Sequence, residues 1–169
     1  MKKFLFPITL LGAALGFGAT SAQAQGKIGY ISMDELVTAM PEAKKADTVL
    51  MAYRDSLGKT QQEMQQELNL EVQQFIKDSA TMPQATKDMK RRELQDLNGQ
   101  IQSFPQDAQN QFNAKQQQLF DPIQRKAVDA IQAVAKENGY TYIIAKENLI
   151  VSPPGDDILD KVKKKLGIQ

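Results

Sequence analysis

The chain has 169 residues, with 21 basic and 20 acidic side chains and no His, Cys or Trp. Without His and Cys, the usual ligands of zinc and copper are missing, and neither a Ser-His nor a Cys-His nucleophile pair can form. The near balance of charge argues against a nucleic-acid-binding protein, which normally carries a basic face. The sequence also has no P-loop, so we expect neither an enzyme nor a cofactor.

The N-terminus has the three-part pattern of a secretory signal peptide. Lys2-Lys3 precedes an apolar run that begins at Phe4 and ends near Ala19, and small residues follow up to Ala24. The run is shorter than the roughly 20 residues that a transmembrane helix needs, and Pro and Gly interrupt it. We therefore predict residues 1–24 to be a signal peptide, cleaved after Ala24, and the remaining chain to be a periplasmic protein.

The first part of the mature chain predicts a strand followed by helices. Residues 27–31 form a short apolar run that is typical of a strand. Ser32 and Glu35 match an S-x-x-E capping box, which predicts a short helix ending near Ala39. Pro41 suits the first turn of a second helix, where its missing N–H is not needed.

The middle of the chain is a mirror image about Met82-Pro83. On both sides, apolar residues recur at steps of three, four and seven, the spacing of a helical seam. The paired residue numbers sum to 164 or 165, as two antiparallel helices joined by a tight turn require. The turn coincides with the helix-breaking run 79–83. This predicts a helical hairpin, the arm (residues 44–118), with these pairs across its seam: Phe75 with Met89, Leu68 with Leu97, Met64 with Ile101, Leu57 with Ala108, and Tyr53 with Phe112.

Both arm helices contain a weak point at the same level. Gly58 lies within a residue of the level of Pro105 when the pairs sum to 165. Proline removes a helical hydrogen bond and kinks its helix, and glycine costs a helix about 1 kcal/mol relative to alanine. We therefore predict a hinge at Gly58 and Pro105, with a fixed kink as the alternative.

The second arm helix is predicted to continue to Asn138-Gly139, a favourable helix stop. Residues 140–145 are rich in β-branched and aromatic side chains and predict a second strand. Residues 146–148 can turn the chain, and residues 149–151 can return it as a third strand. Asp156-Asp157 is expected to begin a last helix, with its acids first and its lysines last.

These strands predict a fold of the α+β class, with the arm standing on a small β-rich base. The strands are apolar on both faces, and such strands are usually buried on both sides. One protomer of this size cannot supply that burial, so we predict self-association through the base. The oligomerisation candidates are Ile28, Tyr30, Tyr142, Ile144 and Ile150.

The order and spacing of several segments resemble the Skp/OmpH family of periplasmic chaperones. These segments are residues 27–31, residues 39–44, the Gln-rich hairpin, residues 121–140 and the ending 156–166. The resemblance implies a homotrimer without cofactors. Residues 25–43 and 119–169 of each protomer would form its β-rich body, and three arms would surround a cavity that holds unfolded outer-membrane β-barrel proteins without ATP.

The chain departs from this family in the charge of its arm. Residues 44–126 carry 12 basic and 11 acidic residues, so long-range attraction to acidic clients or to a membrane surface is only weakly supported. The basic cluster near the tip is interleaved with acids, which favours a solvated helix face. Its members are Lys87, Lys90, Arg91 and Arg92.

The composition of the arm is compatible with a holdase chaperone. A client that leaves without ATP must be held weakly and at many points, by uncharged Gln and by scattered apolar side chains. The client-contact candidates are Leu70, Ile76 and Met82, although Gln can also serve only to solubilise a helix and the apolar residues only to pack. The alternative functions are a structural coiled coil and an adaptor of the cell envelope.

Overall fold

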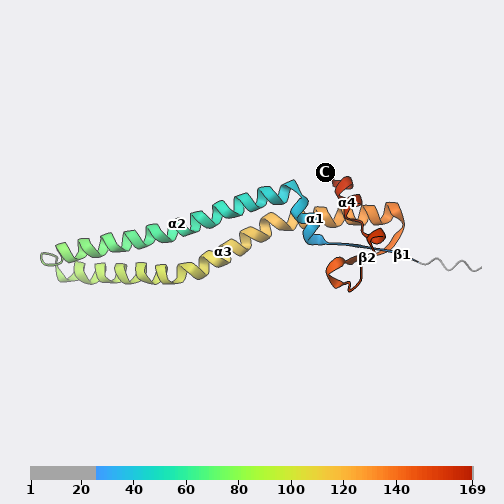
Figure 1. Ribbon diagram of the computed structural model, residues 1–169. Helices are drawn as coiled ribbons and strands as arrows, with labels where there is room; N and C mark the ends of the chain where they lie inside the picture. Colours follow the sequence, from blue (N-terminus) through green and yellow to red (C-terminus); the bar gives the residue numbers. More distant parts are fainter. Residues whose placement is uncertain (1–25, 169) are drawn as a thin grey trace, which may run out of the picture.

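In the computed structural model, residues 26–168 are described, and the predicted signal peptide with its cleavage site after Ala24 lies outside them. The molecule consists of a long arm and a small base (Figure 1). The base contains both strands, two short helices and the C-terminal part of α3, from residue 119 onward. The elements, in chain order, are β1 (Lys27–Ile31), α1 (Met33–Ala39), α2 (Pro41–Asp78), α3 (Gln84–Asn138), β2 (Tyr140–Ala145), η1 (Lys146–Asn148), η2 (Pro154–Asp156) and α4 (Leu159–Leu166).

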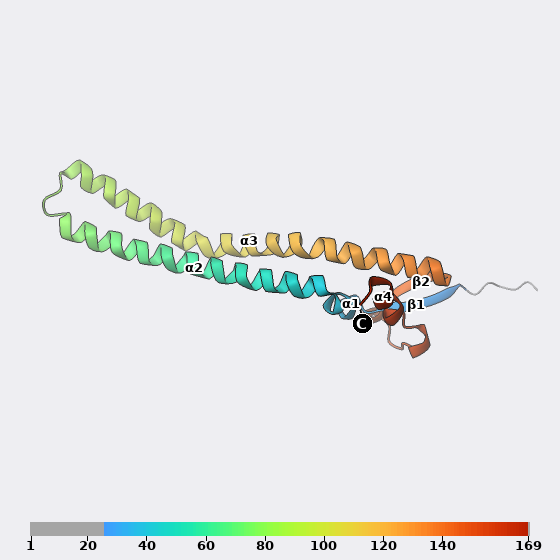
Figure 2. The same ribbon diagram turned by 90° about the horizontal axis from the view of Figure 1, so that it is seen from above.

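The structure confirms the helical hairpin. Helices α2 and α3 run antiparallel along most of the molecule in both views (Figures 1 and 2). The predicted breaker separates them, because α2 ends at Asp78 and α3 begins at Gln84. With its 38 residues, α2 extends about 57 Å. Pro41 is its first residue, and α3 is followed by its C-cap Gly139 in the left-handed conformation, with φ of 70°.

The seam of the arm is half-buried, as expected where only two helices meet. Ile101 is buried, and the other paired residues are partly covered, with one exception. The prediction was wrong for Met89, which is 53% exposed. Stepping back four residues from Leu94 reaches Lys90, which therefore takes the inward position. The Lys90 ammonium group lies 3.6 Å from the Glu71 carboxylate of α2.

The sheet contains two strands, and they are parallel. Ile28 is in register with Tyr142, and Tyr30 with Ile144. The predicted third strand was wrong, because η1 follows β2 and residues 149–151 adopt no strand. Beside Tyr30, the segment after η2 contacts β1 instead, through a bridge to Asp157 and a hydrogen bond from the Ile158 N–H to the Tyr30 carbonyl (3.0 Å).

The core lies in the base, where α1, the start of α2, α3 and α4 meet the sheet. Leu36, Met40, Ile158 and Val162 are fully buried there. Small side chains on both long helices let their backbones approach at the root of the arm: Ala43, Ala46, Ala127 and Ala130. Helix α4 begins at Leu159, later than predicted from Asp156-Asp157. The Pro153-Pro154 pair starts the separate turn η2, and the Asp157 carboxylate accepts a hydrogen bond from the Leu159 N–H (2.9 Å).

Candidate functional site: the arm and its base

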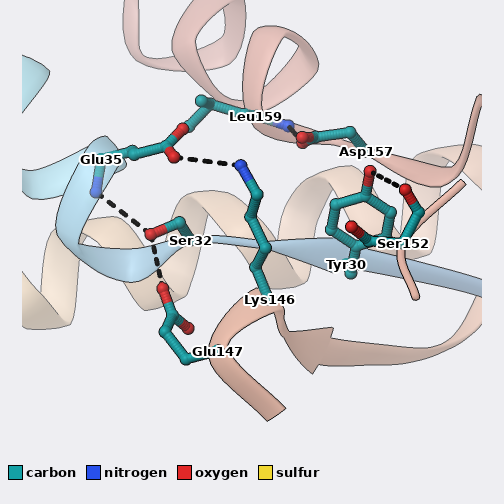
Figure 3. A network of polar contacts seen from close by, with 8 residues as sticks. All are labelled: Tyr30, Ser32, Glu35, Lys146, Glu147, Ser152, Asp157 and Leu159. Carbon is teal, nitrogen blue, oxygen red and sulfur yellow. Dashed lines mark hydrogen bonds and ion pairs between the residues drawn. The ribbon is translucent and has the colours of Figure 1, made fainter. Parts of the chain in front are cut away.

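A network of polar contacts joins β1, α1 and η1 where the arm meets the base (Figure 3). The Ser32 hydroxyl accepts a hydrogen bond from the Glu35 N–H (3.4 Å) and donates one to the Glu147 carboxylate (2.5 Å). This hydroxyl holds the pKa of Glu147 below its ordinary value. The predicted capping box is therefore only half correct, because the Glu35 carboxylate accepts from Lys146 Nζ (3.0 Å) and raises the pKa of that lysine.

Two tyrosines fix the sheet against the segments around it. The buried Tyr30 donates from its hydroxyl to the Ser152 carbonyl (3.3 Å), which ties down the chain after η1 (Figure 3). The buried Tyr140 accepts at its hydroxyl from Lys161 Nζ of α4 (2.8 Å), and the Lys27 ammonium lies 4.1 Å from the centroid of its ring.

The oligomerisation candidates divide into exposed and internal residues. Ile28, Tyr142 and Ile150 are 51%, 65% and 103% exposed, and the first two face each other across the ladder. Ile144 is half-buried and Tyr30 is buried within the protomer, so these two would support an interface only through the strands that carry them. Sequence reasoning missed Val151, which is 76% exposed beside Ile150. Exposed apolar residues gathered on one base are typical of an interaction surface.

The client-contact candidates lie apart from one another on the arm. Leu70 and Ile76 are 67% and 68% exposed, and Met82 is half-buried in the turn. Leu70 and Ile76 point in different directions, because six residues turn a helix by about 240° from one to the other. Met51 is exposed to a similar degree and was missed, because the seam spacing alone does not separate it from its neighbour Leu50.

The two hinge candidates line one depression between α2 and α3. Gly58 and Pro105 border it together with Leu57, Phe104 and Phe112, and its volume is about 310 Å³. Helix α3 continues through Pro105, and Figure 2 shows it changing direction near the middle of its length. Gly58 and Pro105 therefore lie at the same level of the arm, as predicted, while bending of the arm at this level stays a prediction.

Among residues 26–168, no group of three or more carboxylates is arranged to hold a metal ion. No helix in this part of the chain combines the length and the apolarity that crossing a membrane requires.

Comparison with known proteins gives the family. The family model for outer membrane proteins of the OmpH-like type matches residues 27–166, which span both strands, the whole arm and α4. The chain belongs to the OmpH-like family. This assignment confirms the family resemblance of the sequence.

Named members of the OmpH-like family align over nearly the whole chain. The chaperone protein Skp of Photorhabdus luminescens is 26% identical over 170 residues, which cover 98% of this chain and 99% of the relative. The chaperone protein Skp of Vibrio cholerae is 24% identical and covers 86% of each chain. These relatives are chaperones by name, in agreement with the expectation of a protein that is not an enzyme.

A solved structure shares the fold. An OmpH-like outer membrane chaperone from Caulobacter crescentus superposes with a TM-score of 0.71, at 20% identity and with 90% of each chain covered. This similarity confirms the α+β fold with a long helical hairpin on a small base.

Proposed function

We propose that this OmpH-family protein is an ATP-independent periplasmic holdase that binds unfolded outer-membrane β-barrel proteins between helical arms and prevents their aggregation. The observation that carries the proposal is the arm itself. It is about 57 Å long, has almost no interior, and exposes apolar side chains singly rather than as one patch. Its relatives are named as chaperones.

Exposed apolar side chains that are spread over the arm suit a client that has no fixed shape. A single large apolar patch would favour one folded partner, which is the adaptor alternative. Leu70, Ile76 and Met51 are each exposed by more than half and are separated by polar surface. Each contact is weak, so the client can leave without an energy source, while many contacts together keep it from aggregating.

The base supports assembly of several arms. The apolar residues Ile28, Tyr142, Ile150 and Val151 are exposed in one protomer. Covering them with equivalent surfaces of two further copies would form the homotrimer and place three arms around a cavity. In this arrangement, residues 25–43 and 119–169 form the body, and the periplasm is reached through the signal peptide 1–24.

Light scattering tests the holdase function. An unfolded β-barrel protein is diluted from urea into buffer, with and without a several-fold excess of the mature protein. We expect suppressed scattering near one trimer per client, with and without added nucleotide. Undiminished scattering would contradict the proposal and favour the structural coiled coil or the adaptor. Native mass of the complex gives the stoichiometry.

A further inference from the structure

The two faces of the arm differ in charge. In a helix, the residues before and after a seam position lie about 100° to either side of it. None of the residues that follow a seam position from Tyr53 to Phe75 in α2 or from Leu94 to Phe112 in α3 is acidic, and most carry amides: Gln65, Asn69, Gln95, Asn98, Gln102, Gln109 and Asn113. Among the residues that precede one, five are acidic: Glu63, Glu67, Glu93, Asp96 and Asp107.

Because the helices are antiparallel, the residues that follow seam positions in α2 and in α3 lie on the same side of the hairpin. The residues that precede seam positions lie together on the other side. Glu67 lines one depression together with Glu93 and Asp96, which defines an acidic face. Gly58, the residue after the seam position Leu57, lines the 310 Å³ depression described above, here called the pocket, together with Gln109. These residues define an amide face. The amide face is therefore free of acids over residues 53–76 of α2 and 94–113 of α3, and its pocket lies near the middle of the arm.

The pocket combines aromatic walls with an amide rim. Phe104 and Phe112 of α3 are half-buried and leave part of their rings at the surface. The Arg54 guanidinium lies 4.7 Å from the centroid of the Phe112 ring. Gly58 opens the side formed by α2, because a Cβ atom built there would meet nothing within 4 Å. Gln61 and Gln109 stand exposed beside this opening.

We propose that this pocket binds an aromatic side chain of an unfolded polypeptide, with the backbone of that polypeptide hydrogen-bonded to the amide face. The inference rests on the proposed function and names the feature of the client that the arm recognises. An incoming ring would pack at an angle against the two phenylalanines, the arrangement that aromatic pairs prefer. The Gln side chains offer both a donor and an acceptor, as the peptide groups of the client do.

An unfolded outer-membrane protein fits this pocket better than other polypeptides do. Transmembrane β-strands carry aromatic residues in girdles at both ends of their apolar band, so such a client presents rings at regular intervals. Among the residues that line the pocket, Arg54 alone is charged, so the amide rim adds no further ion that must lose its water when the client backbone approaches. One pocket per arm is a weak site, and several arms would bind the same chain by multivalency.

Filling the pocket tests the inference. The change Gly58→Leu places a side chain where the ring would enter, and leucine favours a helix more than glycine does, so the arm is preserved. Gly99→Leu is the matched control, because Gly99 is also helical, also has nothing within 4 Å of its Cβ position, and lies outside the pocket. Circular dichroism checks that both variants keep their helices.

Two readouts are used with an unfolded β-barrel client. Anisotropy of the labelled client gives its affinity, and the Trp emission of the client reports ring burial without background, because this protein contains no Trp. A second client has its girdle aromatics replaced by leucine. We expect Gly58→Leu to bind the first client about three- to tenfold more weakly than the wild type, and Gly99→Leu to bind it unchanged.

The second client decides whether aromatic rings are recognised. We expect wild type and Gly58→Leu to bind it equally, both more weakly than the wild type binds the first client. Equal binding of the first client by wild type and Gly58→Leu would overturn the pocket but leave the holdase function intact. If Gly58→Leu lowered the affinity for both clients by the same factor, the preference for aromatic side chains would be overturned. No binding of either client by the wild type would overturn the holdase function and the pocket together.

Discussion

Strand β1 packs so closely against its surroundings that Gly29 leaves no room for a methyl group. A Cβ atom there would lie 2.9 Å from Cε1 of Tyr140 and 3.0 Å from Cγ2 of Ile158. Neither neighbour can retreat easily. Ile158 is fully buried, and the hydroxyl of Tyr140 accepts a hydrogen bond from Lys161. We expect Gly29→Ala to overpack the base and to destabilise the protein by about 1–3 kcal/mol.

Urea unfolding followed by circular dichroism measures this loss. Because stability falls by about 1–3 kcal/mol per molar urea, the midpoint should drop by about 1 M. All variants are compared at one protein concentration, since assembly makes stability depend on concentration. Gly99→Ala is the control, because the arm leaves its Cβ position open, and it should gain up to about 1 kcal/mol. An unchanged midpoint for Gly29→Ala would show that the Tyr140 ring swings away and is not fixed.

Three further outcomes are expected. Ser32→Ala should lose the cap of α1, at a cost of about 1 kcal/mol. Ser32 also lowers the pKa of Glu147 from its ordinary value of 4.5, and the stability from this contact is present above that pH and is lost as the pH falls through the lowered pKa. The difference between the urea midpoints of variant and wild type should therefore narrow in acid to the part that the helix cap contributes. Ile150→Asp, at a side chain fully exposed in the protomer, should release folded monomers in sedimentation, and a wild type that sediments as a monomer would contradict the trimer. If the arm has a hinge, replacing Gly58 and Pro105 together by Ala should slow hydrogen exchange of the surrounding amides and narrow the range of client sizes protected. Wild-type amides there that are already as protected as their neighbours would exclude the hinge.

Local signals in the sequence sufficed for most of the helices. Ser32, Pro41 and Gly139 mark helix ends through chemistry that acts within a few residues, and the structure has all three where predicted. The symmetric spacing of apolar residues located the turn, because the residues paired across a hairpin lie at equal distances along the chain from its turn. It failed at Met89, because Lys90 takes the inward position, with its ammonium group 2.7 Å from Glu93 of the same helix and 3.6 Å from Glu71 of α2.

Features that depend on distant partners could not be predicted in this way. Residues 149–151 favour a strand by composition, yet strand formation needs an open edge, and the edge of β1 at Tyr30 is taken by Asp157 and Ile158. The pocket on the amide face also depends on two helices at once. In the sequence, Gly58 and Pro105 each indicate only a weak point in a helix. The structure shows that both line one pocket together with Phe104 and Phe112.

The parallel ladder has a consequence for the order of folding. It joins Lys27 to Tyr140 and Ile31 to Ala145, so the whole arm lies between the paired residues. Closing so long a loop is entropically costly and slow, whereas helical turns form locally within about a microsecond. When α2 and α3 pair progressively from their turn, the two strands approach each other, and the loop that remains to be closed becomes shorter. The arm therefore brings β1 and β2 together, and mutations in its seam should slow the folding of a sheet that they never touch.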